Sequence, residues 1–184
     1  SVDANYMFTV TQRVRNTGTE PVALNPYSLV SRHGTPETSG YYILHEGPLG
    51  VMNGTLREVG YGDLSGAAQP MAHETTGGWI GITDKYWLVS LVPPQDQPST
   101  LRFVHSQRDG VSRYQVDLLG QPTTVQPGAA AEYTTRLFAG AKEVRLLDSY
   151  EAQFGIPRFD RAVDFGWFYW LTKPFFYALD YLAR

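Results

Sequence analysis

The 184-residue sequence carries a formal net charge of −3, is 42% hydrophobic and 18% charged, and contains no cysteine. A chain of this length and composition is expected to fold as a globular domain with a sizeable core. The slightly acidic balance argues against a nucleic-acid partner, which requires a strongly basic surface, and the lack of cysteine excludes disulfides, thiolate metal sites and cysteine nucleophiles.

The first predicted elements are two strands. In residues 5–18, Phe8, Val10 and Val14 share one face and polar side chains take the other, which predicts a half-buried antiparallel strand. Residues 22–32 are predicted to return as a second strand, confined by Pro26 to a sheet edge or a bulge. Residues 33–76 have a weaker pattern and predict long connections with brief strands.

Hairpin signals dominate the middle of the chain. Strands are predicted at residues 78–82 and 85–92, and again at 99–107 and 112–120, where Asp109-Gly110 is a strong two-residue turn signal. A last strand follows a turn at residues 126–128 and alternates as far as Leu137. The chain is therefore expected to be mainly β, an antiparallel β-sandwich, rather than a series of alternating βαβ units.

The period changes to that of a helix after Gly140. Val144, Leu147, Tyr150, Glu151 and Phe154 lie at helical spacings of three or four residues, and Gly155 provides a stop. The sequence thus predicts two parts, a β-sandwich region at residues 1–141 and C-terminal α-helices at residues 142–184.

The C-terminal tail is unusually aromatic. Nine of the eighteen residues from Phe165 to Leu182 are aromatic, against 14% of the whole chain. Lys173 and Pro174 interrupt the tail, which therefore falls short of the roughly 18 to 20 apolar residues of a membrane span. Pro174 predicts a kink or two separate segments, the second with Thr172 as its N-cap. The first ten residues lack the basic and apolar regions of a signal peptide.

The predicted tail helix is strongly amphipathic. At a 3.6-residue period, Lys173, Asp180 and Arg184 form a narrow charged strip. The opposite wide face has two possible contacts, the core of the chain or a membrane interface, where mixed Trp, Tyr and Phe side chains are common. The stripe on this membrane- or core-facing side consists of Trp167, Trp170, Leu171, Phe175, Ala178, Tyr181 and Leu182.

Catalytic and metal-binding motifs are not found in the sequence. No two of the four histidines lie within four residues of each other, and no Gly-x-Ser-x-Gly elbow, dinucleotide fingerprint or phosphate-binding loop occurs. His105 lies on the same strand face as Leu101 and Phe103, which favours a structural role. We therefore expect no enzyme, no cofactor and no metal site.

Four segments in order resemble the periplasmic domain of the bacterial membrane protein insertase family YidC. They are "YMFTVTQRVRNTG", "GGWIGITDKYWLVSLVP", "TTVQPGAAAEYTTRLFAGAKEV" and "VDFGWFYWLTKPFF". The resemblance implies a β-supersandwich similar to galactose-mutarotase-like domains. It also implies an amphipathic C-terminal helix on the periplasmic leaflet, entered at Asp164 and Gly166.

The same resemblance implies a role and a location. The chain would be a non-catalytic fragment of a multi-pass protein, on the periplasmic side of the inner membrane, that assists insertion and folding of inner-membrane proteins. Its partners would be the inner-membrane lipid surface, accessory subunits of the Sec translocon and nascent membrane proteins. In the family, segments like "YMFTV" follow an earlier set of strands, so this chain is expected to be the later part of the domain and to expose strand edges.

Two other functions fit the same sequence. One is a carbohydrate-binding or mutarotase-like sandwich, for which His73, His105 and Glu132 are the candidate site residues. The other is a structural interaction domain whose aromatic tail docks on a protein instead of on lipid.

Overall fold

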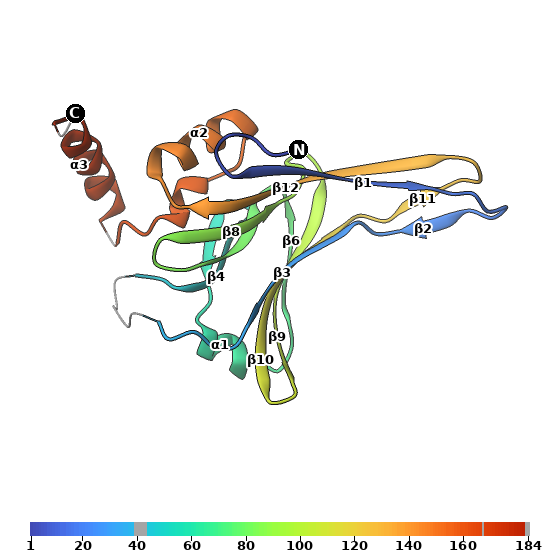
Figure 1. Ribbon diagram of the computed structural model, residues 1–184, viewed down its shortest axis with the longest axis horizontal. Coiled ribbons are helices and arrows are strands. Elements are labelled where there is room, and N and C mark those ends of the chain that lie inside the picture. The colour runs from blue at the N-terminus through green and yellow to red at the C-terminus, as the bar shows by residue number, and fades with distance from the viewer. Residues whose placement is uncertain (39–43, 167, 183–184) are drawn as a thin grey trace.

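A computed structural model describes residues 1–38, 44–166 and 168–182 of the chain (Figure 1). The predicted fold class is confirmed, because antiparallel sheets pack as a sandwich and helices follow at the C-terminus. The larger sheet has the strand order β1 (Met7–Arg15), β12 (Ala130–Ala141), β8 (Trp87–Val92), β7 (Trp79–Thr83), β4 (Gly47–Met52) and β5 (Thr55–Glu58).

The second sheet of the sandwich has four strands, and a further two-stranded ribbon extends one end of the molecule (Figure 1). The four-stranded sheet has the order β3 (Tyr27–His33), β10 (Val111–Gly120), β9 (Pro98–Arg108) and β6 (Met71–Thr76). The ribbon pairs β2 (Val22–Leu24) with β11 (Thr123–Val125). The helices are α1 (Tyr61–Gly66), α2 (Val144–Phe154), the 3-10 helix η1 (Phe159–Ala162) and α3 (Tyr169–Leu182).

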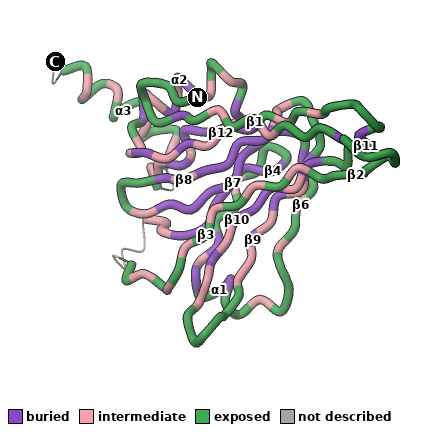
Figure 2. Tube along the Cα trace, turned by 45° about the vertical axis from the view of Figure 1, so that its right-hand side comes forward, coloured by how far each residue is buried: buried purple, intermediate pink, exposed green. Residues whose placement is uncertain are grey.

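Two hydrophobic clusters lie on opposite faces of the six-stranded sheet. One fills the space between the sheets and includes Ile80, Leu91 and Phe103. The other lies beneath α2 and η1 and includes Phe138 and Leu147. Because this sheet is covered on both faces, β4 and β7 are buried along their whole lengths, as Figure 2 shows for the central strands. The cluster beneath α2 and η1 contains residues from both sides of the predicted division at residue 141. The division into two parts therefore stays a prediction.

The predicted hairpins are confirmed, and the turn residues explain why. Asp109 and Gly110 both have positive φ, 54° and 77°, and join β9 to β10. Asn53 and Gly54, with φ of 50° and 72°, do the same between β4 and β5. Two adjacent positive φ values match the twist of an antiparallel pair, which favours Asn-Gly and Asp-Gly at such turns.

Two expectations for the N-terminal half were too simple. The strand predicted at 22–32 is divided into β2 and β3, with Pro26 in the gap between them. Residues 33–76 hold more regular structure than the sequence pattern indicated, since β4, β5, α1 and β6 all lie there. Glycine and proline begin β4, and the pattern of a fully buried strand has no alternation to detect.

The half-buried face predicted for β1 is exposed in the structure. Phe8, Val10 and Val14 are 37%, 41% and 43% exposed. Phe8 pairs with Leu137, which packs against the core between the sheets, so this face of β1 points toward the same interior. The prediction that Phe8, Val10 and Val14 form a buried face was therefore wrong for this chain. The reason is that β1 and β3 are edge strands of their sheets, and among the described residues neither has a further strand beyond it.

Candidate functional site

The helices α2 and η1 form a platform on the six-stranded sheet. Leu147 and Tyr150 of α2 are buried, and Gly155 ends the helix with a φ of 64°. Phe159 of η1 is also buried, and its ring packs edge-on against Trp79 at 5.3 Å between centroids. The apolar side chains of both helices therefore face the sheet, and the acidic side chains of Asp148, Glu151 and Asp160 lie where the two helices meet.

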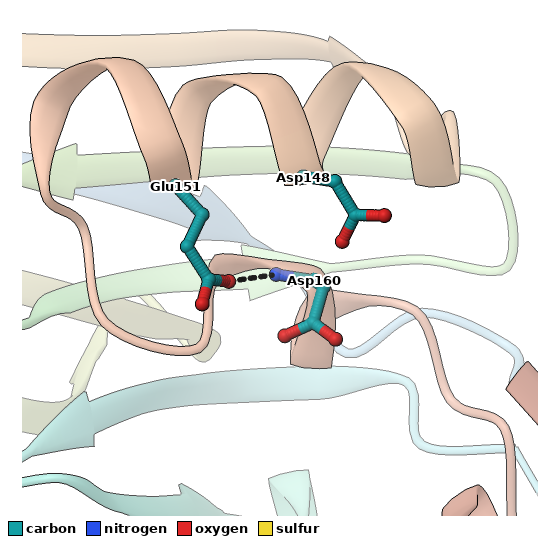
Figure 3. Close-up of side chains that lie close together, drawn as sticks. All are labelled: Asp148, Glu151 and Asp160. Carbon is teal, nitrogen blue, oxygen red and sulfur yellow. Dashed lines mark hydrogen bonds between the residues drawn. The ribbon is translucent and has the colours of Figure 1, made fainter.

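Three carboxylates from this platform converge on one place. Asp148 and Glu151 project from α2 toward Asp160 on η1, and their oxygens lie within 4.8 Å of one another (Figure 3). Glu151 accepts a hydrogen bond from the Asp160 backbone N–H at 3.4 Å. Burial and the nearby charge of Asp160 raise the pKa of Glu151. Carboxylates so close together repel each other and require a cation to balance them.

Lys173 of α3 supplies that cation. Its Nζ lies 2.7 Å from Asp148 Oδ1 and 2.5 Å from Asp160 Oδ2. Burial alone would lower the pKa of Lys173, but the hydrogen bonds to Asp148 and Asp160 outweigh burial and raise it. Although carboxylates are the ligands that Ca²⁺ prefers, Asp148 and Asp160 are paired with a lysine here, so the cluster is an ion-pair network.

The polar strip of α3 makes the other contacts with the platform. Tyr169 donates a hydrogen bond to Asp160, and Tyr177 donates one to Asp148. Asp180 forms an ion pair with Arg145 of α2. The strip at 169, 173, 177 and 180 has the spacing of one helix face, so α3 lies with this face against α2 and η1.

The apolar stripe of α3 faces away from the platform. No residue of α3 described by the structure is buried, and Trp170, Phe175 and Tyr181 are 72%, 59% and 78% exposed. Figure 2 shows α3 as exposed and intermediate along its length. The remaining described members of the predicted stripe, Leu171, Ala178 and Leu182, are exposed as well, and Trp167 lies outside the described residues.

The predicted stripe therefore does not pack on the core of this chain, and its contact with a membrane stays a prediction. Among the helices that the structure describes, none combines the length and the apolar character needed to cross a bilayer.

The entry into α3 is formed by a short hydrogen-bonded turn. Asp164 Oδ1 accepts a hydrogen bond from the Gly166 backbone N–H at 2.7 Å, and Gly166 has a φ of 72°. Asp164 Oδ2 also accepts one from the His45 N–H at 3.2 Å. The two-segment alternative was wrong, because α3 continues through Pro174 and the Thr172 hydroxyl bonds the Phe168 carbonyl at 3.1 Å instead of capping a second helix. A functional role for this entry stays a prediction.

Sequence reasoning missed a polar network on the four-stranded sheet. The side chain of Asp117 is fully buried and accepts hydrogen bonds from Arg102 Nε at 2.7 Å, Gln115 Nε2 at 2.8 Å and Tyr27 Oη at 3.1 Å. The sequence did contain a signal for the pairing of Arg102 with Asp117. The two-residue turn at Asp109-Gly110 sets the register of β9 and β10, and this register places the two residues opposite each other.

The residues nominated for a sugar-binding site are engaged elsewhere. His73 packs edge-on against Phe103, and His105 hydrogen-bonds Ser112 at 3.2 Å, both in the four-stranded sheet. Glu132 belongs to the six-stranded sheet, where it pairs with Arg13 at 3.2 Å. The three side chains thus have separate partners, and the structure gives no support to a shared site.

Comparison with known proteins gives a consistent result along the chain. The family model of the YidC periplasmic domain matches residues 1–178. A membrane protein insertase YidC of Granulibacter bethesdensis is 50% identical, with 99% of this chain and 32% of the relative covered. Those of Sinorhizobium fredii and Methylorubrum extorquens are 45% and 47% identical, with 100% and 98% of this chain covered. The chain spans about a third of the length of these relatives, 31% in the last two.

Proposed function

This chain belongs to the family of YidC periplasmic domains, and we propose that it works without catalysis as the periplasmic part of a membrane protein insertase. The family match extends over nearly the whole chain and supports placing it on the periplasmic side of the inner membrane. In this proposal the insertase activity belongs to the longer protein, and the domain contributes contacts with lipid, with nascent membrane proteins and with Sec accessory subunits.

The observation that carries the lipid contact is the orientation of α3. Its polar strip is held by α2 and η1, so its aromatic stripe points outward as a continuous apolar surface. Transferring one Phe- or Leu-sized side chain from water to an apolar environment contributes about 1.5–3 kcal/mol. Several such side chains, mixed with Trp and Tyr, are enough to hold an amphipathic helix in a bilayer interface.

The surface that best supports a contact with protein partners is the outer side of the four-stranded sheet. Asp117 holds Arg102 and Tyr27 in fixed positions there, and Leu29 on the same side is 48% exposed. Preorganised polar groups beside exposed apolar ones are typical of recognition surfaces. The exposed face of β1 we assign instead to packing within the longer polypeptide, as the family resemblance implies.

Flotation with phosphatidylethanolamine–phosphatidylglycerol vesicles tests the lipid contact. The chain is expected to float with the vesicles, and the Trp170→Ala/Phe175→Ala variant is expected to lose most of its binding. The matched control is Tyr86→Ala/Trp87→Ala, which removes two aromatic side chains of similar exposure, 64% and 59%, from the sandwich. Equal flotation of the chain and the α3 variant, or none by either, would remove the lipid contact from the proposal.

A further inference from the structure

We propose that the carboxylates of Asp148 and Asp160, with Glu151 beside them, form a releasable, ion-sensitive dock for α3, and that Lys173 is the positioning residue that holds the helix there. The inference rests on the proposed function for its purpose, because docking determines where the outward apolar stripe lies relative to the sandwich. The attachment itself is a property of α2, η1 and α3 and can be tested separately.

The contacts that hold α3 to the platform are almost entirely polar. Tyr169 and Tyr177 donate hydrogen bonds to the carboxylates, and the Arg161 guanidinium lies 3.3 Å from the centre of the Tyr169 ring. The ring of Phe176 packs edge-on against that of Phe165, with 6.0 Å between the ring centroids, but no described residue of α3 is buried. The hydrophobic effect, which dominates stable packing between helices, therefore contributes little to this attachment.

One cation of α3 pairs with two of the three carboxylates, and the third, Glu151, lies beside them. Lys173 is the only Lys or Arg within the described residues of α3, and its side chain bridges Asp148 on α2 and Asp160 on η1. Asp160 is 4% exposed, so without Lys173 its charge would be poorly solvated and close to two like charges. The neighbouring cations, Arg145 of α2 and Arg161 of η1, remain on the platform whether or not α3 is present.

Water and salt reach the network from its open side. The side chains of Lys173 and Asp148 are 18% and 29% exposed. Ion pairs that are accessible to solvent weaken as ionic strength rises, since the screening length falls from about 10 Å at 0.1 M salt to about 3 Å at 1 M. We therefore expect salt to shift α3 from the docked to the released arrangement.

Release would change the position of α3 without changing its fold. The strip and the stripe belong to opposite faces of one helix, so α3 can leave the platform and still present its apolar stripe to lipid. Gly166, with a φ of 72° and open space around its α-carbon, precedes the first residue of α3 by three positions and has a conformation that glycine adopts easily. Docking thus couples the orientation of the sandwich to that of the membrane-facing helix.

The test is a distance measurement between spin labels on α2 and α3 in the full-length insertase in lipid nanodiscs. Labels are placed through Ser149→Cys and Leu179→Cys, both exposed positions, with every other cysteine of the full-length protein replaced. At low salt a single narrow distance is expected. Raising salt to 1 M, or introducing Lys173→Met, is expected to broaden the distribution and shift it to longer distances, whereas Lys173→Arg retains the narrow one.

Arg13→Met is the matched control, because it removes one positive charge from an ion pair with Glu132 on β1 and β12, whereas α3 is bonded to α2 and η1. The proposal is overturned if Lys173→Met leaves the distance unchanged, if 1 M salt has no effect, or if Arg13→Met broadens the distribution equally. Loss of vesicle flotation with a distance that still responds to Lys173→Met would defeat the lipid contact and leave the dock standing. Vesicle flotation together with a distance that responds neither to Lys173→Met nor to salt would defeat the dock and leave the lipid contact standing.

Discussion

The two C-terminal helices are both amphipathic, yet they use opposite faces to contact the rest of the molecule. Leu147 and Tyr150 of α2 enter the core on the six-stranded sheet. In α3 the polar side chains face inward and the apolar stripe faces outward. Because α2 and η1 already cover that side of the sheet, α3 meets a polar platform, so amphipathicity alone does not reveal which face of a helix is the contact face.

The sharpest test of this difference is to truncate one leucine in each helix. Leu147→Ala in α2 is expected to lower the free energy of unfolding by about 2–5 kcal/mol, because it opens a cavity in the core. Leu179→Ala in α3, at a position 65% exposed, is expected to change it by less than about 0.5 kcal/mol. Chemical denaturation measures both, and similar losses in the two variants would show that α3 packs as α2 does.

A tyrosine that bonds an aspartate occurs in each helix and gives a second, smaller contrast. The Tyr150 hydroxyl donates to Asp3 Oδ2 at 2.6 Å and lies 2.8 Å from the Asn5 carbonyl oxygen. Tyr150→Phe is expected to destabilise the fold by about 1–2 kcal/mol. Tyr177→Phe removes the bond to Asp148 but is expected to leave thermal unfolding nearly unchanged. A larger loss from Tyr177→Phe than from Tyr150→Phe would contradict the comparison.

The same tyrosine of α2 predicts a pH effect on the stability of the fold. Burial, reinforced by the hydrogen bond to Asp3, raises the pKa of Tyr150 above its ordinary value. The native state therefore holds the phenolic proton more tightly, so this stability is complete below about pH 10 and is lost as pH rises through the raised value.

Thermal melts between pH 8 and 11 are expected to show a falling midpoint, and Tyr150→Phe is expected to flatten the fall. Burial also raises the pKa of Tyr61 to about 12, so part of the fall should persist in the variant. An unchanged slope in Tyr150→Phe would show that this hydroxyl does not control the alkaline transition.

Much of the sandwich was predictable because its signals are local. Alternation identified β12, and the Asp109-Gly110 turn identified the hairpin of β9 and β10. The buried strand β4 was harder to predict, since a strand covered on both faces shows no alternation. The helix pattern of α2 was equally clear, and its buried residues are Val144, Leu147 and Tyr150, three of the five named in advance.

The candidate site was predictable only as two faces of one helix. Spacing in the sequence placed Lys173 and Asp180 on a strip opposite Trp170 and Phe175. It could not show that Asp148 and Asp160, 25 and 13 residues away from Lys173, would form its binding partners. Such a contact depends on how α2 and η1 pack on the sheet, and no pattern within α3 contains that information.

The sequence by itself therefore determined the fold class, the turns, the helix faces and the family resemblance, because each depends on neighbouring residues along the chain. Only the tertiary structure decided which apolar faces are covered. Phe8 and Val14 of β1 lie exposed despite a clear alternating pattern, and Lys173 pairs with Asp148 and Asp160, a contact that sequence spacing did not foresee. The physical reason is that burial depends on the surface that other elements leave open, which periodicity does not specify.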